Sequence, residues 1–165
     1  MKPDELQQLL AAFAAERVAL LDRHVAGARV VSHYDFNNAY QYVISREETH
    51  LQWLQAALGA APPPASAALP VPEAPKAGKK DDTARLRTIY EDDVRQLAAF
   101  VARWRPRVEA MTDARHRKML DVILGESREH EQLFAQAAAG NEDLLGRRTG
   151  GVARQGSVLP VRWME

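Results

Sequence analysis

The sequence predicts an all-α fold, an antiparallel four-helix bundle, and three observations support this. Apolar residues recur at helical spacing in four segments of similar length. Short connections join the first two segments and the last two, so each pair is expected to form an antiparallel hairpin. A long Pro-rich stretch joins the two hairpins, and each hairpin alone would leave its apolar face in water. We therefore assign residues 1–140 to one bundle and residues 141–165 to an extended tail.

The first two helices are expected at about residues 3–26 and 35–58. Pro3 suits the first helical position, because its missing N–H is not needed there. Gly27 is expected to end the first helix, and Gly59 the second.

Residues 60–82 form the predicted crossover between the second and third helices. Prolines at 62–64, 70, 72 and 75 exclude a helix there. An extended Pro-rich segment rises ~3.1 Å per residue, so this one could reach roughly 60–70 Å. A helix of ~24 residues is about 36 Å long, so the crossover can span the bundle with slack.

The last two helices are expected at about residues 83–105 and 113–139. Pro106 is expected to bend the third helix or to end it near Arg105. Gly140 is expected to end the fourth helix, and the tail that follows has no clear period.

The composition excludes several classes of function. Lys plus Arg and Asp plus Glu number 22 each, which gives no support for nucleic acid or an anionic membrane as partner. Weak charge repulsion makes a homodimer or a larger homo-oligomer plausible. The absence of cysteine excludes disulfides, thiolate metal sites and cysteine nucleophiles. No secretory signal and no apolar run of about 18 residues is present, so a cytoplasmic protein without membrane spans is expected.

Each expected helix carries a carboxylate on its apolar stripe, and two also carry a histidine. Burying a carboxylate is costly unless it is paired or bound to a metal. Two divalent ions would offset four carboxylates, and imidazoles would complete their coordination. The stripes therefore predict a dinuclear site for Fe or Mn, with Zn as an alternative occupant, built from Glu16, Glu47, His50, Asp93, Glu126 and His130.

The second helix contains the more regular of two Glu/His motifs. Glu47 and His50 are three residues apart, so both side chains lie on one face of the helix. In the fourth helix Glu126 lies four residues before His130, and the position three before is Ser127.

These motifs, Arg-Glu-Glu-Thr-His-Leu at 46–51 and Glu-Ser-Arg-Glu-His-Glu at 126–131, resemble the inward motifs of the rubrerythrin-type branch of the ferritin-like superfamily. The resemblance covers residues 3–139 and includes the long crossover. It implies a di-iron or di-manganese carboxylate site that handles O₂ or peroxide, as an oxidoreductase of peroxidase or ferroxidase type or in iron handling. The chain lacks a rubredoxin module, so redox turnover would need an external electron donor. The ligands implied are Glu16, Glu47, His50, Asp93 or Glu91, and His130.

Two departures from the family pattern leave alternatives open. Ser127 is a poor ligand, and Glu126 could replace it only with a shifted geometry. The site could equally be incomplete, in which case the bundle would serve as a structural or interaction module. On the third helix the apolar stripe favours Asp93, whereas side-chain length favours Glu91.

The other three histidines, His24, His33 and His116, are expected to be exposed. Only His50 and His130 then face inward, which argues against a mononuclear, hydrolase-like site with three histidines.

Overall fold

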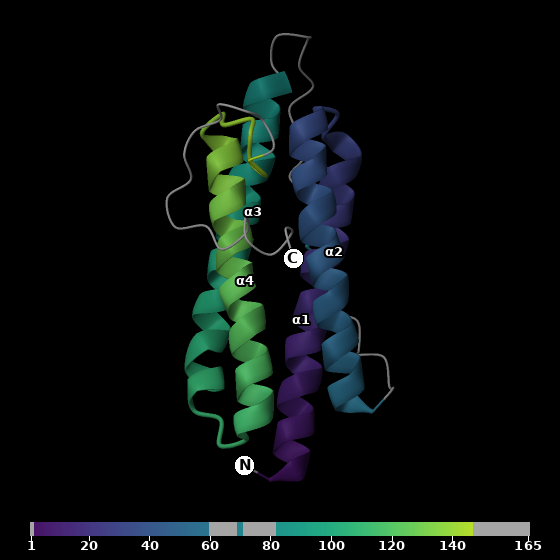
Figure 1. Ribbon diagram of the computed structural model, residues 1–165, viewed down its shortest axis with the longest axis vertical. Helices are drawn as coiled ribbons and strands as arrows, with labels where there is room; N and C mark the ends of the chain where they lie inside the picture. The colour runs from purple at the N-terminus through teal and green to yellow at the C-terminus, as the bar shows by residue number, and fades with distance from the viewer. Residues whose placement is uncertain (1, 60–68, 71–81, 147–165) are drawn as a thin grey trace.

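The computed structural model describes residues 2–59, 69–70 and 82–146, and this part of the chain is all-helical. Four helices are present: α1 (Pro3–Val30), α2 (Tyr34–Leu58), α3 (Asp82–Glu109) and α4 (Ala114–Ala138) (Figure 1). The predicted all-α fold class is therefore confirmed. None of the described helices is long and apolar enough to cross a membrane.

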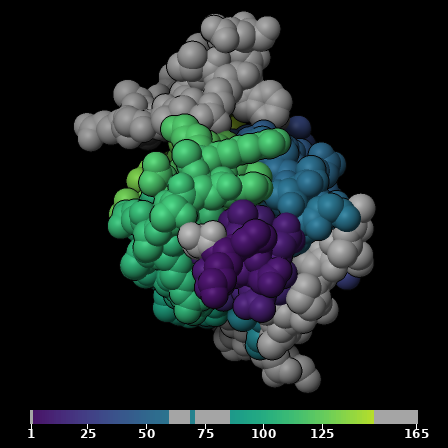
Figure 2. Space-filling view, turned by 90° about the horizontal axis from the view of Figure 1, so that it is seen from below, coloured from purple at the N-terminus to yellow at the C-terminus, as the bar shows by residue number. Residues whose placement is uncertain are grey.

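The four helices lie side by side along the long axis of the molecule. In Figure 1 the chain runs upward along α1, downward along α2 and α3, and upward again along α4. α1 packs chiefly on α2 and α3 on α4, while α1 also meets α3, and α2 meets α4. Seen from below, the start of α1 adjoins both α2 and the α3–α4 side (Figure 2).

α1 does not end at Gly27, as the sequence predicted, but continues to Val30. Gly27 is buried and faces Tyr40 of α2. A Cβ atom at position 27 would lie 3.0 Å from Cε1 of that ring, which is too close for ordinary packing. Gly27 therefore allows α1 and α2 to approach each other closely and does not end α1.

α3 does not end near Arg105, which was one of the two outcomes expected at Pro106. Pro106 lies inside the helix, which continues to Glu109. Trp104 and Val108 are buried on either side of it. Their burial anchors the last turn against the core and offsets the hydrogen bond that the proline cannot make.

Two predicted helix ends are confirmed. α2 ends at Gly59 and α4 is followed by Gly140, both with positive φ, at 74° and 86°. Glycine adopts this left-handed conformation without the steric penalty of a Cβ. Asp113 caps the start of α4 by accepting a 2.9 Å hydrogen bond from the backbone N–H of His116.

Most of the predicted crossover and tail lies outside the described residues. Within the crossover, Leu69 packs on the core and the Pro70 carbonyl accepts a hydrogen bond from Arg23 of α1. Within the tail, Leu144 is buried, so the segment 141–146 packs back onto the bundle.

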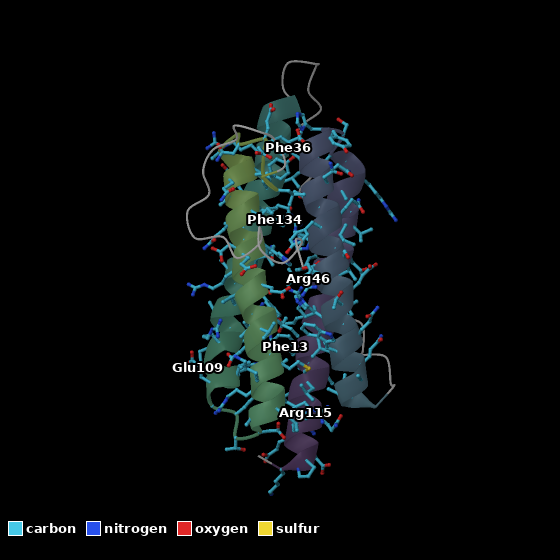
Figure 3. All side chains as sticks on the ribbon, viewed as in Figure 1. Phe13, Phe36, Arg46, Glu109, Arg115 and Phe134 are labelled. Atoms are coloured by element: carbon cyan, nitrogen blue, oxygen red, sulfur yellow. The ribbon has the colours of Figure 1, made fainter. Side chains whose placement is uncertain are left out.

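Aromatic contacts mark two levels of the core. Phe13 meets Trp104 edge-on with ring centroids 5.0 Å apart, and Tyr40 packs on Phe134 at 4.9 Å. In Figure 3, Arg46 lies between the heights of Phe13 and Phe134. The polar residues described next occupy the interior near this middle level.

Candidate functional site

A cluster of charged and polar side chains is buried among the four helices, and we call it the interior network. Every helix contributes to it, and each member is at most 4% exposed. The members are Arg17, Arg23, His24, Glu47, His50, Asp93, Glu126, Ser127 and His130.

Arg17 of α1 lies at the centre of the network and is fully buried. Its Nη2 donates to Oε1 of Glu47 at 3.0 Å, and its Nη1 donates to Oγ of Ser127 at 3.2 Å. The same Nη2 lies 3.4 Å from Nδ1 of His50. A guanidinium group thus stands among residues that the sequence had assigned to a metal site.

Glu47 of α2 has a second partner on α1. Its Oε2 accepts a 2.9 Å hydrogen bond from Nδ1 of His24. Burial by itself would raise the pKa of Glu47, but its interactions with His24 and Arg17 outweigh burial and lower the pKa to about 2. This carboxylate is therefore ionised in the folded protein at neutral pH.

Glu126 of α4 is held from α2 by two residues. Arg46 binds both of its oxygens, at 2.9 and 2.8 Å, and Nε2 of His50 donates to it at 3.0 Å. Burial opposes ionisation, yet the hydrogen bonds from His50 and Arg46 lower the pKa of Glu126 further than burial raises it. Because Nε2 of His50 donates, its Nδ1 is left to accept from Arg17.

Asp93 of α3 forms the other arm of the network. Arg23 Nε donates to its Oδ1 at 2.7 Å, and the Tyr40 hydroxyl donates to its Oδ2. Burial raises the pKa of Asp93, against the lowering effect of His24 and Arg23. Nε2 of His24 lies 3.9 Å from Asp93, so His24 joins the two arms.

His130 of α4 differs from the other members. Its side chain is fully buried, and both ring nitrogens lack a hydrogen-bond partner among the described residues. Burial lowers its pKa to about 3, so the ring is neutral at physiological pH. Its ring centroid lies 6.5 Å from that of His50.

The structure places five of the seven predicted ligands inside the bundle: Glu47, His50, Asp93, Glu126 and His130. The other two require correction. The Glu16 side chain is 29% exposed and pairs with Arg103 of α3, because the buried face of α1 runs through position 17 instead. The Glu91 side chain is 44% exposed and pairs with Arg87 one turn earlier, so Asp93 is the carboxylate that α3 turns inward.

Sequence reasoning missed the positive half of the network. The predicted site contains neither Arg17 nor Arg23, and His24, which was expected to be exposed, is fully buried. The signal was present in α1, where Phe13, Arg17, Leu20 and His24 recur at steps of three and four. The predicted ligand Glu16 instead lies at the alternative step of three from Phe13.

Two divalent ions would have to be placed beside the arginines of this network. Among the described residues, the carboxylates of Glu47, Asp93 and Glu126 each pair with one arginine, and the partner of Glu126, Arg46, is partly exposed. Their charge is therefore already balanced. Two dications would add a large uncompensated positive charge beside Arg17. Among the described residues, the three donor atoms that lie within 4.8 Å of one another belong to a different group, His33, Asp35 and Glu142.

Comparison of the chain with protein-family models, with curated proteins and with solved structures finds no match in any of the three.

Proposed function

We propose that the chain is an antiparallel four-helix bundle of ferritin-like topology that works as a structural or interaction module without a dinuclear metal centre. One observation carries this proposal. Arg17 is fully buried and contacts Glu47, His50 and Ser127. Its guanidinium group therefore neutralises the carboxylate of Glu47. Ser127, which interrupts the family motif, is a partner of this arginine.

The geometry of the network supports a scaffold role. Arg17 links α1 to α2 and α4, and Arg23 links α1 to α3. Arg46, which is partly exposed, reaches in from α2 to Glu126 of α4. Directional hydrogen bonds between buried charges penalise any sliding of one helix along another, because a displaced charge would lose its partner. The network therefore fixes the register of all four helices.

A second candidate is the dinuclear Fe or Mn oxidoreductase, acting on O₂ or peroxide, that the family resemblance implies. The observation that favours it is His130, whose two buried ring nitrogens have no partner among the described residues. It would require Arg17 to leave the centre of the network and its partners there. We rank it second for that reason.

Metal analysis separates the two candidates. Protein expressed in medium supplemented with iron and manganese, then dialysed against EDTA, is expected to retain neither metal at a stoichiometric level. Its thermal unfolding midpoint is expected to stay the same when Fe²⁺ or Mn²⁺ is added back, because arginines and not these ions balance the interior carboxylates. About two Fe or Mn ions per chain, lost in a Glu47→Gln variant, would establish the second candidate instead.

A further inference from the structure

A second group of ligand-type side chains lies at the end of the bundle where α1 turns into α2. His33 precedes α2, Asp35 lies in its first turn, and Glu142 follows α4. A ring nitrogen of His33 and one carboxylate oxygen from each acid all lie within 4.8 Å of one another. In Figure 1 the α1–α2 turn and the end of α4 lie at the same, upper end of the molecule.

From this geometry we infer a surface site for one divalent transition-metal ion, with Zn²⁺ as the ion that fits the donors. One imidazole and two carboxylates form a ligand set that suits Zn²⁺, and a water would complete a tetrahedron. The site carries two acidic groups and no thiolate, so Cu(I) is disfavoured. It is separate from the interior network and shares no residue with it.

Hydrogen bonds hold the two ligands of the α1–α2 turn in place. The side chain of Asn37 donates to the carbonyl oxygens of Ala28 and Val31, at 2.9 and 3.1 Å. The backbone carbonyl of His33 accepts from the N–H of Asn37 at 2.8 Å. The backbone on both sides of the metal ligands is thus fixed before any ion binds, which lowers the entropic cost of binding.

The third ligand comes from a segment that is also fixed. Gly140, with its positive φ, turns the chain back after α4, and the N–H of Asn141 bonds to the carbonyl of Gln136 at 3.0 Å. Leu144 is buried, and its N–H donates to the carbonyl of Glu142 at 3.0 Å. This anchor directs Glu142 toward His33, whose Nε2 lies 3.9 Å from a Glu142 oxygen.

The ring of His33 is held by packing. It packs on Phe36 with centroids 4.6 Å apart and its Nδ1 is shielded from solvent, so Nε2 is the nitrogen that faces Glu142, at 3.9 Å. The stacking fixes the plane of the imidazole. An ion bound by His33, Asp35 and Glu142 would link the α1–α2 turn to the segment that follows α4. We therefore expect the ion to stabilise this end of the bundle.

Calorimetric titration with ZnCl₂ tests this site. EDTA-treated protein in a buffer free of chelator at neutral pH is expected to bind one Zn²⁺ per chain. Removing a ligand in His33→Asn, Asp35→Asn or Glu142→Gln should weaken binding at least about tenfold. These residues are partly exposed, so the variants should fold, which circular dichroism can verify.

His116 provides the matched control. It is also partly buried and lies beside an acid, with Nδ1 2.9 Å from Asp113, but it belongs to no group with three converging donors among the described residues. His116→Asn should therefore leave Zn²⁺ binding unchanged. Absence of saturable binding in the wild-type chain would overturn the inference, and so would binding that all three ligand variants retain. Neither result bears on Arg17, because the interior network is tested by iron and manganese content.

Discussion

Replacing Arg17 by leucine is expected to lower the free energy of unfolding by about 3–5 kcal/mol. The variant would leave the ionised carboxylate of Glu47 inside the core with His24 as its remaining hydrogen-bond partner in the network. It would also remove the donor to Ser127. An uncompensated buried charge is among the largest destabilising effects that a single substitution produces. Urea unfolding followed by circular dichroism measures the loss.

Arg103 is the matched control for this experiment. It also pairs with a glutamate, Glu16, at 3.0 Å, but its side chain is 49% exposed. Exposed ion pairs contribute at most about 1 kcal/mol, so Arg103→Leu should cost that or less. Equal losses for Arg17→Leu and Arg103→Leu would mean that the buried guanidinium has no special role.

The second large effect is a loss of stability in mild acid. The pKa of His130 is about 3 in the folded protein, whereas an ordinary histidine titrates near 6.5. Between these pH values His130 is protonated in the unfolded chain but not in the folded chain. The free energy of unfolding therefore falls as the pH is lowered through this range. The slope is at most about 1.4 kcal/mol per pH unit for one such group.

Buried carboxylates also change how the free energy of unfolding depends on pH, mainly at low pH. Glu47 has its pKa lowered to about 2, so its contribution is present above its ordinary pKa near 4.5 and is lost as the pH falls toward 2. The pKa of Asp93 is raised, so the folded chain binds this proton at a higher pH than the unfolded chain does. Asp93 therefore increases the free energy of unfolding as the pH falls. Glu47 therefore contributes to the loss of stability mainly below pH 4.5, whereas His130 contributes up to about pH 6.5.

A His130→Leu variant separates the contribution of His130 from that of His50, whose pKa is also lowered by burial. Leucine has a similar volume and no titrating group, so the fall in unfolding free energy between pH 6.5 and 5 should become shallower than in the wild-type chain. Denaturant unfolding at a series of pH values gives the two slopes. Identical slopes would show that the pKa of His130 does not differ between the folded and unfolded protein.

Much of the fold could be predicted because local signals agree with one another. Gly59 and Gly140 end their helices in the left-handed conformation that glycine favours. Gly27 and Pro106 do not end their helices, because packing with other residues overrides their local preference. Tyr40 lies against Gly27, and the buried Trp104 and Val108 hold the helix on both sides of Pro106.

The interior could be predicted on α2, α3 and α4 but not on α1. From Phe13, a step of three leads to Glu16 and a step of four leads to Arg17, and both steps are helical. Hydrophobic spacing alone does not choose between them. The choice follows from tertiary charge balance, since the inward carboxylates of Glu47, Asp93 and Glu126 require cations that face them.

The most direct test of the central claim is a double-mutant cycle between Arg17 and Glu47, measured in EDTA. If the arginine is the cation that neutralises this carboxylate, Arg17→Leu and Glu47→Leu should each be costly, and the double variant should cost less than their sum. The expected coupling energy is about 2–3 kcal/mol, and adding iron or manganese should leave it unchanged. Additive losses in EDTA, or a wild-type chain that iron or manganese stabilises through Glu47, would contradict the claim.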